Sequence, residues 1–523
     1  MNNSVSLQQA CEWIKDKFEI DVSISNLSYL VQYGQIRKFN SNGQTRVLIE
    51  DLNVYYSRLM NRAADWQKNL GKNLNWHLSF EKVTEKDRTK HVHRLHPYKG
   101  KFIPQLVEYF LDSHTDEFKE VVFFTPGDIV LDPFCGSGTT LVQANELGIN
   151  AIGIDISEFN SLISNVKIQK HEFNRITQEV VRITIALNQQ PETDIYKLFD
   201  KELLSTLSEY NKQFFPSPEY VYQVRNNRID QFNYAREKEK EFKLFFYELI
   251  NKYGIKVKQA NINFSFLEKW FLYPVRKEID LVNSLINEIN HEDTKKVLRI
   301  ILSRTMRSCR ATTHADLATL IDPISEPYYC QKHYKICKPI FSINYWWGYY
   351  SKDTIKRLKE FEKIRTNTFQ YCLTGDSRTL DIEMNLKSNF PNNPISGRKI
   401  RGIFTSPPYI GMIDYHEQHA YAYEMLGLPR RDNQEIGRLS KGKNGGAKND
   451  YIEGIVSVLL NCKKYLDDDS NIFIVANDNQ NIYPRIIDRS GMKIIREYLR
   501  PVLCRTEKDK SEYSETIFHI KSN

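Results

Sequence analysis

The stretch that decides the fold reads Asp128-Ile-Val-Leu-Asp-Pro-Phe-Cys-Gly-Ser-Gly-Thr-Thr140. Its apolar run, residues 129–131, has the composition of a buried parallel strand and ends on Asp132. Two glycines then turn the chain into a helix that two threonines open. A strand, a glycine-rich turn and a helix N-terminus in this order direct backbone N–H groups outward at the carboxyl edge of a sheet. The stretch therefore predicts an α/β fold with a ligand site at that edge.

The next predicted strand, residues 150–154, ends on Asp155. This acid follows the glycines by about 20 residues, the spacing at which a carboxylate meets ribose hydroxyls in dinucleotide-type folds. A glycine-rich turn alone is a weak signal, because many α/β folds use one to pack a helix on a strand. Here a strand precedes the turn, a helix follows it, and an acid ends the next strand.

A second stretch lies far downstream, Gly402-Ile-Phe-Thr-Ser-Pro-Pro-Tyr-Ile-Gly-Met-Ile-Asp-Tyr415. A short apolar strand ends here, and Ser406-Pro407-Pro408-Tyr409 follows it. Two prolines fix the backbone and remove N–H donors, which leaves carbonyls and the Ser406 hydroxyl as acceptors. Tyr409 adds an aromatic face, so the set suits an exocyclic amine on a ring. Taken alone, the tetrad has a second interpretation, a Pro-Pro loop that only ends a strand.

Together, Asp-Pro-Phe-Cys-Gly-Ser-Gly and Ser-Pro-Pro-Tyr resemble the amino-methylating DNA methyltransferases, over residues 90–160 and 370–520. A tetrad that begins with Ser is typical of the cytosine-N4 branch, whereas adenine-N6 enzymes more often begin it with Asp or Asn. The resemblance implies S-adenosylmethionine as cofactor, double-stranded DNA as substrate and a doubly wound, Rossmann-like methyltransferase sheet. It implies no metal in the transfer step.

The resemblance also assigns residues. For catalysis it implies Ser406, Pro407, Pro408 and Tyr409: Tyr409 stacks on the flipped base, while Ser406 and the Pro407 carbonyl accept from its amine. Asp376 is expected to accept from the adenine amino group of the cofactor. The full set of residues expected to bind the cofactor is His96, Tyr98, Lys99, Gly100, Lys101, Phe102, Asp132, Pro133, Phe134, Gly136, Ser137, Gly138, Thr139, Thr140, Asp155, Ile156, Asp376 and Ser377.

The third strand of the sheet is expected only at residues 371–378. A gap of about 200 residues is too long for a crossover connection and predicts an inserted domain, which carries helical apolar repeats. In the resembling family such an insert usually recognises the target. The predicted division is a helix-turn-helix-like module at 1–60, a linker at 61–90, the cofactor part at 91–160, a mainly helical insert at 161–368 and the catalytic part at 369–523.

The N-terminal module is predicted from two helices, a hairpin around an Asn-Gly turn and a further helix. The order resembles the winged helix-turn-helix of excisionase-type proteins. Arg37, Lys38 and Arg46 on the hairpin are candidates for phosphate contacts, and a solvated basic hairpin is the alternative. The insert adds three further candidates for DNA contact, Arg304, Arg307 and Arg310.

A cysteine and histidine cluster in the insert has the spacing of metal ligands. Cys330-x2-His333-x3-Cys337 could ligate zinc, with Cys309 or His314 as the fourth ligand. The alternative is a set of buried thiols beside a solvated histidine.

Composition agrees with a polyanionic partner. The 523 residues carry a net charge of +8 and a pI of about 8.8. No apolar run approaches the roughly 18 residues of a membrane span, and the eight cysteines are scattered. These features predict a cytoplasmic protein with reduced thiols, and the resemblance implies a prokaryotic cell. No pattern predicts an oligomeric state.

The resemblance implies the modification enzyme of a restriction-modification system, with the endonuclease as a separate chain. The sequence itself shows no nuclease constellation. Three alternatives stay open: adenine-N6 methylation, RNA guanine-N2 methylation and a non-enzymatic DNA-binding regulator.

Overall fold

The computed structural model describes residues 4–32, 35–41, 44–71, 73–81, 83–98, 100–258, 265–314, 316, 320–442, 444–502 and 513–522. The chain divides into two compact units. The N-terminal unit comprises Met1–Asn69, Ile185–Leu281 and Ser308–Asn344, and the sheet unit comprises Leu70–Thr184, Val282–Arg307 and Tyr345–Asn523.

The N-terminal unit begins with a small three-stranded antiparallel sheet and three helices. Their bounds are β1 (Ser4–Ser6), α1 (Leu7–Phe18), α2 (Ile24–Gln32), β2 (Lys38–Ser41), β3 (Gln44–Leu48) and α3 (Ile49–Leu70). The sheet order is β1-β3-β2. Ser6 and Gln9 cap α1 reciprocally, and Ile14, Leu27 and Val47 pack in the core beneath it. The helix and hairpin order agrees with the expected module, but α3 runs through the first part of the predicted linker.

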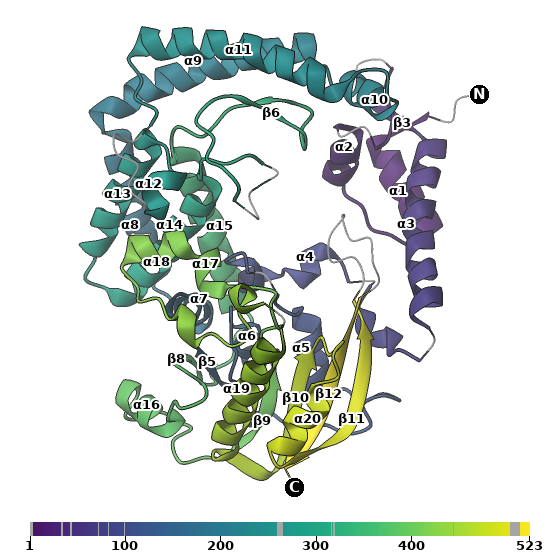
Figure 1. Cartoon of the computed structure of the whole chain (residues 1–523), viewed down its shortest axis with the longest axis vertical. Coiled ribbons are helices and arrows are strands. Elements are labelled where there is room, and N and C mark those ends of the chain that lie inside the picture. Colours follow the sequence, from purple (N-terminus) through teal and green to yellow (C-terminus); the bar gives the residue numbers. More distant parts are fainter. Residues whose placement is uncertain are drawn as a thin grey trace. The chain divides into compact units, whose positions relative to one another are not determined.

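The rest of the N-terminal unit is mainly helical, with one short hairpin. It contains α9 (Pro191–Phe214), α10 (Glu219–Arg225), α11 (Gln231–Tyr253), α12 (Phe266–Trp270), β6 (Tyr328–Cys330) and β7 (Lys335–Cys337). Helices α9 and α11 lie side by side (Figure 1) and contact through aromatic pairs such as Tyr210 with Phe242. Five of the described helices cross the boundary between the units: α3, α8 (Phe173–Asn188), α13 (Tyr273–Asn287), α14 (Glu292–Ser308) and α15 (Asn344–Glu362).

The sheet unit is built on seven strands in the order β11-β12-β10-β9-β4-β5-β8. Their bounds are β4 (Ile129–Asp132), β5 (Asn150–Asp155), β8 (Gln370–Thr374), β9 (Ile400–Thr405), β10 (Leu466–Ala476), β11 (Met492–Pro501) and β12 (Ser514–Ser522). The central strands are parallel, and β12 is antiparallel to β10 and β11. From β4 the chain proceeds to β5 and β8 on one side, then returns to β9 and β10 on the other. The expected doubly wound α/β sheet is confirmed, and the adjacent strands β4 and β9 form its switch point.

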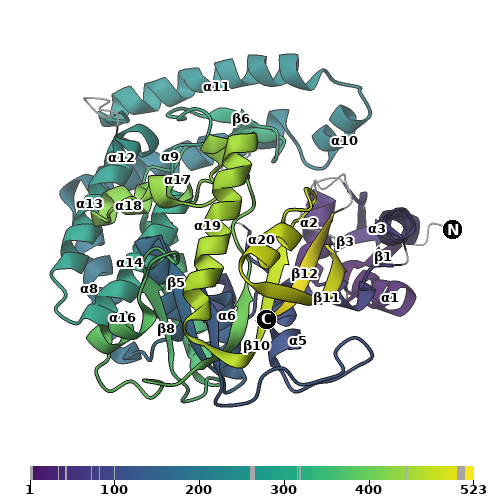
Figure 2. The ribbon, with the colours of Figure 1, turned by 60° about the horizontal axis from the view of Figure 1, so that its bottom comes forward.

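Helices cover both faces of this sheet. Successive side chains of a strand point to opposite faces, and the apolar ones on each face pack against a layer of helices. Ile403 faces Tyr451 and Ile455 within one apolar core, and its neighbour Phe404 meets Phe110 on the opposite face. One face carries α5 (Pro104–Leu111), α6 (Thr139–Glu146) and α7 (Glu158–Ile168). The other carries α16 (Ile382–Asn389), α19 (Gly445–Lys463) and α20 (Tyr483–Arg489), of which α19 and α20 stand in front of the strands in Figure 2.

The compact units and the domains predicted from the sequence differ in the insert. Residues 161–184, 282–307 and 345–368 fall in the predicted insert but belong to the sheet unit. Helix α7 shows the reason, because the Ser161 hydroxyl and the Asn165 amide donate to β8 backbone carbonyls. Helical periodicity alone does not tell a helix that covers the sheet from one in an insert. Among the helices of the described residues, none is long and apolar enough to cross a membrane.

Candidate active site

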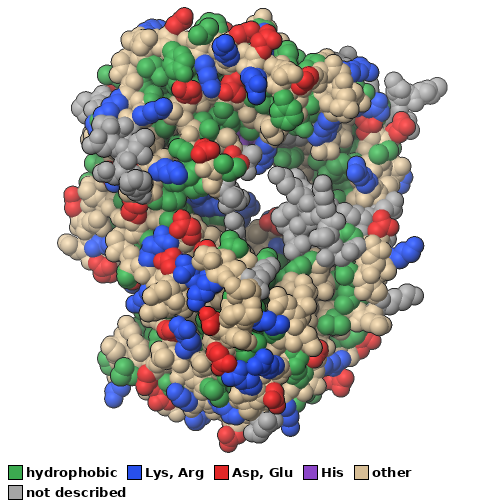
Figure 3. Space-filling model, in the orientation of Figure 1, with side chains coloured by type: hydrophobic (Ala, Val, Ile, Leu, Met, Phe, Trp, Pro, Cys, Tyr) green, Lys and Arg blue, Asp and Glu red, His purple; other side chains and the backbone are tan. Residues whose placement is uncertain are grey.

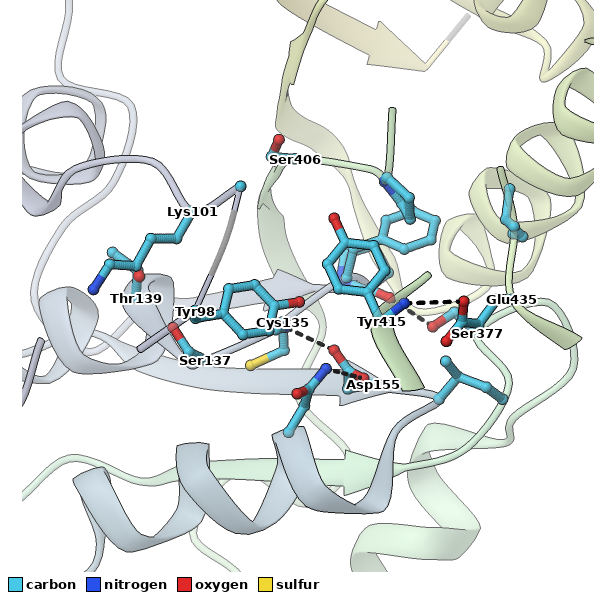
Figure 4. A pocket seen from close by; sticks show the side chains of 18 of the residues that line it. Tyr98, Lys101, Cys135, Ser137, Thr139, Asp155, Ser377, Ser406, Tyr415 and Glu435 are labelled. Atoms are coloured by element: carbon cyan, nitrogen blue, oxygen red, sulfur yellow. Dashed lines mark hydrogen bonds between the residues drawn. The ribbon is translucent and has the colours of Figure 1, made fainter. Parts of the chain in front are cut away.

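The carboxyl ends of four neighbouring strands surround one cavity. Strand β5 ends on Asp155, β8 leads to Asp376 and β9 leads to Ser406, while the turn after β4 forms the floor. The cavity measures about 810 Å³. Its lining residues are Tyr98, Gly100, Lys101, Phe102, Pro133, Phe134, Cys135, Gly136, Ser137, Thr139, Asp155, Ile156, Asn160, Asp376, Ser377, Ser406, Pro408, Tyr415, Gln434, Glu435 and Ile436. The two motifs, about 270 residues apart in sequence, therefore share one cavity (Figure 4).

Asp132 joins the two motifs without lining the cavity. Its carboxylate accepts from Thr140 Oγ1 and from Thr405 Oγ1, each at 2.6 Å. The backbone N–H of Phe134 donates to it at 3.2 Å. Burial raises the pKa of Asp132 to about 6, against these hydrogen bonds. The prediction that Asp132 binds the cofactor is corrected to a structural role, because its side chain fixes the end of β9 against the end of β4.

Asp155 lines the cavity, and three hydrogen-bond donors fix its carboxylate. Its carboxylate accepts from the backbone N–H of Gly136 at 2.7 Å and from Asn160 Nδ2 at 3.1 Å (Figure 4). The backbone N–H of Ser157 also donates to it, at 2.8 Å. Burial is the largest influence on this group and raises its pKa to about 7. The three donors fix the carboxylate at the end of β5, where a ligand with adjacent hydroxyls can reach it.

The glycine turn is closed on the other side by an aromatic pair. Gly136 has φ +52°, and a Cβ atom there would lie 2.9 Å from the Tyr98 hydroxyl. Tyr98 stacks on Tyr415, with ring centroids 5.7 Å apart and planes 21° apart. Glu435 supports this arrangement by accepting from the Tyr415 backbone N–H at 3.3 Å. The turn and the two rings thus bound one end of the cavity.

Asp376 and Ser377 complete the cavity from β8. Arg378 binds both oxygens of Asp376, with Nη2 at 2.6 Å from Oδ2. Burial acts to raise the pKa of Asp376, but the Arg378 hydrogen bonds outweigh it and hold that pKa below its usual range. The Ser377 hydroxyl donates to the Pro133 carbonyl at 2.6 Å, which ties this wall to the glycine turn.

The catalytic tetrad divides between the cavity and its surroundings. Ser406 and Pro408 line the cavity, whereas Pro407 and Tyr409 are outside the lining set. The Tyr409 hydroxyl donates to Glu515 at 2.8 Å, and Glu515 also pairs with Arg500 at 2.7 Å. Burial, followed by Glu515, raises the pKa of Tyr409 well above its ordinary value. Tyr409 is therefore a neutral phenol with a fixed hydroxyl, and its aromatic ring is what it can offer a base.

Cys135 was not expected in the lining. Burial raises the pKa of its thiol well above the ordinary value. A Cβ atom on Gly153 would lie 2.5 Å from Cys135 Sγ, so the thiol packs against the β5 backbone. A protonated, packed thiol does not serve as a nucleophile.

Several predicted cofactor residues are not in the lining. Besides Asp132 these are Gly138, Thr140 and His96, and Lys99 is outside the described residues. His96 is buried, with Nε2 at 3.0 Å from the Ser303 hydroxyl, so its predicted role is corrected to packing. Lys101 lines the cavity, but its ammonium donates to the His93 carbonyl at 2.5 Å. The Lys101 ammonium is therefore already engaged within the protein.

The sequence interpretation missed six lining residues: Cys135, Asn160, Tyr415, Gln434, Glu435 and Ile436. Cys135 and Tyr415 lie within the two quoted stretches, so their proximity to the motifs was the available signal. No local pattern marks residues 434–436, which reach the cavity only through the tertiary fold.

The arginines proposed for DNA contact are mostly engaged within the protein. Arg37 binds both oxygens of Asp51, and Arg46 donates to the Ser4 carbonyl at 2.5 Å. The Lys38 side chain is outside the described residues. On the face in Figure 3, basic and acidic side chains are interspersed, so the net charge of +8 is not gathered into one patch there.

The two buried arginines of the insert are corrected. Arg304 and Arg310 are 5% and 7% exposed. Arg304 pairs with Asp353 at 2.5 Å and lies over the Tyr350 ring. The guanidinium of Arg304 is buried in this ion pair and is not available to a phosphate. Arg307 is half-buried and remains a candidate for DNA contact.

Three predicted metal ligands come together with one of the two candidates for the fourth ligand. Cys330, His333 and Cys337 gather with His314, so His314 is the fourth member of the group and Cys309 lies outside it.

Similar known proteins match either the whole chain or parts of it. A family model described as DNA methylase matches residues 11–165. The type II methyltransferase M.MjaII of Methanocaldococcus jannaschii is 44% identical over 522 residues, which are 99% of this chain and 96% of that protein. The chain belongs to this DNA methylase family.

Two further type II methyltransferases match this DNA methylase over shorter stretches. M.BsoBI of Geobacillus stearothermophilus is 36% identical over 17% of this chain and 16% of its own, and M.MvaI of Kocuria varians is 30% identical over 20% of this chain and 21% of its own.

A DNA methylase takes its methyl group from S-adenosylmethionine, and the cavity fits that group. The carboxylates of Asp155 and Asp376 suit the ribose hydroxyls and the adenine amino group. Phe102, Phe134 and Ile156 supply apolar contact for the ring.

Proposed function

We propose that this DNA methylase transfers the methyl group to the exocyclic N4 amine of a cytosine flipped out of duplex DNA. The observation that carries the proposal is that Ser406 and Asp155 line one cavity. Asp155 belongs to the end that suits the donor, and Ser406 belongs to the tetrad that suits an amine. A tetrad led by Ser rather than Asp or Asn is the feature that favours cytosine over adenine.

Flipping is required because the amine is paired and stacked within the duplex. In the flipped state the Ser406 oxygen and the Pro407 carbonyl accept the two N–H groups, which turns the nitrogen lone pair toward the donor. The Tyr409 ring stacks on the base, and its hydrogen bond to Glu515 holds the ring in place. These residues act by positioning and by accepting hydrogen bonds that strengthen as the amine gains positive charge.

Bound S-adenosylmethionine supplies a methyl group activated by a positive sulfonium. The amine nitrogen forms a bond to this carbon as the carbon–sulfur bond of the donor breaks, so S-adenosylhomocysteine is the leaving group. The nitrogen then loses one proton to water, while the acceptors beside its N–H bonds stabilise the positive charge until the proton leaves. Cys135 takes no part as a nucleophile because its thiol is protonated and packed. No metal is part of the proposed step.

We propose further that the enzyme is the modification partner of a restriction-modification system. The type II methyltransferase relative that spans the whole chain supports this role. The companion endonuclease is then a separate protein, and the N-terminal module and Arg307 are the candidates for additional DNA contact.

Nucleoside mass spectrometry tests the proposal. Purified protein, S-adenosylmethionine carrying a deuterated methyl group and unmodified DNA are incubated, and the DNA is digested to nucleosides. We expect deuterated N4-methylcytosine in the wild type and a strong reduction in Ser406→Ala. Deuterated N6-methyladenine would contradict the base assignment, and label in RNA but not DNA would contradict the substrate class.

A further inference from the structure

We infer that His314, Cys330, His333 and Cys337 form a Zn²⁺ site in the N-terminal unit. One ligand atom from each residue lies within 4.8 Å of all the others. The set contains two sulfur and two imidazole donors, the combination that favours zinc in tetrahedral geometry. The methyl transfer proposed above makes no use of such a site.

Two distances from His333 match two edges of a zinc tetrahedron. His333 Nδ1 lies 3.5 Å from Cys330 Sγ and 3.6 Å from Cys337 Sγ. With Zn–S near 2.3 Å and Zn–N near 2.0–2.1 Å, tetrahedral geometry separates a bound sulfur from a bound nitrogen by about 3.5–3.6 Å. Both sulfurs therefore stand at the separation from His333 that a shared ion imposes.

The hairpin places three of the four ligands. Cys330 ends β6, Cys337 ends β7 and pairs with Tyr328, and His333 lies in the turn between the strands. The His333 backbone N–H donates to the Cys330 carbonyl at 3.1 Å, which bends the turn back toward the first cysteine. This backbone order brings the donors together before any ion binds.

His314 reaches the hairpin from an earlier segment and is oriented by a second residue. The Tyr328 hydroxyl lies 2.8 Å from His314 Nδ1. A hydrogen bond at one ring nitrogen fixes the imidazole and presents the other nitrogen, as partners of metal-bound histidines do. The His314 and His333 rings lie with centroids 4.4 Å apart at 62°, so two ligands face one point without stacking.

The environment favours an ion over separate thiols. Cys330 and Cys337 are 2% and 7% exposed and pack with Tyr328 and Ile324. A second candidate cluster, His91 with His93 and Glu146, differs because the Lys90 ammonium lies 2.6 Å from Glu146 and already neutralises it.

Four protein ligands leave no open position, so the zinc is structural. It would fasten the segment around His314 to the hairpin. The hairpin in turn is held by the Asn211 amide of α9, which bonds both polar backbone groups of Ile336, and by Glu239 of α11, which accepts from the Tyr329 N–H. The ion would thus complete the packing of the hairpin against the long helices of its unit.

Metal analysis of the full-length protein, purified without chelator, tests the inference. We expect one zinc per chain by inductively coupled plasma mass spectrometry. The zinc absorption edge should report two sulfur neighbours near 2.3 Å and two nitrogen neighbours near 2.0–2.1 Å. A zinc content near zero, or a shell of nitrogen and oxygen alone, would overturn the site, and these wild-type readings need no variant.

Variants then test the ligand set. Cys330→Ser, Cys337→Ser and His314→Ala should each lose most of the zinc. Cys309→Ser is the matched control, since Cys309 is 1% exposed and lies outside the cluster, and it should keep its zinc. Loss of zinc in Cys309→Ser together with retention in His314→Ala would contradict the assignment of the fourth ligand.

Discussion

Asp155 links the affinity for the donor to pH. Burial raises its pKa to about 7, and in the proposed complex its ionised form accepts from the ribose hydroxyls. We therefore expect S-adenosylhomocysteine, which cannot transfer a methyl group, to bind about tenfold more tightly at pH 8 than at pH 6, by isothermal titration calorimetry. Asp155→Asn should bind more weakly with a flatter pH dependence, and an unchanged slope in this variant would contradict the assignment.

The raised pKa of Asp155 also affects the free energy of unfolding. Whereas the affinity for the donor is expected to rise with pH, this contribution to stability falls with pH. Between about pH 4 and pH 7 the folded state keeps a proton on Asp155 that the unfolded chain releases. The Asp155 contribution to the free energy of unfolding therefore falls as pH rises through this window. Urea denaturation of the ligand-free wild type and of Asp155→Asn should show a difference that changes in this window and is constant above it.

A substitution at Gly136 tests whether cofactor affinity depends on the close approach of the turn to Tyr98. Gly136→Ala would bring a Cβ atom to 2.9 Å from the Tyr98 hydroxyl at φ +52°. We expect the affinity for S-adenosylhomocysteine to fall by about ten- to a hundredfold, because strain of this kind costs roughly 1–3 kcal/mol. Gly397→Ala is the matched control, since Gly397 has φ +71° with nothing within 4 Å of its added Cβ. Equal affinity losses in the two variants would show that the approach to Tyr98 does not matter.

At the scale of elements, the joint between β4 and β9 aligns the two motifs. Thr405→Val removes one of the two hydroxyls that donate to buried Asp132. We expect a loss of about 1–3 kcal/mol in the free energy of unfolding, because a buried acceptor loses its partner, together with slower methyl transfer. Ser470→Ala in β10 should be near neutral in urea denaturation, since this buried hydroxyl has no hydrogen-bond partner among the described residues. A neutral Thr405→Val would contradict the proposed joint.

Features that depend on interactions between residues close in sequence could be predicted, and features that depend on distant residues could not. The strand, turn and helix around Gly136 were predictable because apolar runs, glycines and caps act within a few residues. The clamp of Thr140 and Thr405 on Asp132 was not, because it joins groups 273 residues apart in sequence. The wall at residues 434–436 and the helices of the sheet unit within the predicted insert also depend on tertiary packing, which periodicity does not specify.

At the scale of the whole molecule, the two sites belong to different compact units. Hydrogen–deuterium exchange should therefore separate them. S-adenosylhomocysteine should protect peptides around Tyr98, Gly136, Asp155 and Ser406, while a zinc chelator should expose peptides that cover residues 308–314 and 328–337. Exposure of the sheet peptides by the chelator to the same extent would contradict independent sites.

The central claim is that the cavity beneath Ser406 is where the amine meets the methyl donor, and one measurement tests it most directly. It is the single-turnover rate of DNA methylation by Ser406→Ala, with the dissociation constant of S-adenosylhomocysteine measured in parallel. We predict that the rate falls by about ten- to a hundredfold while the dissociation constant changes by less than about threefold, because Ser406 contacts the amine. Ser457→Ala on the exposed face of α19 should keep the wild-type rate. A wild-type rate in Ser406→Ala would contradict the account.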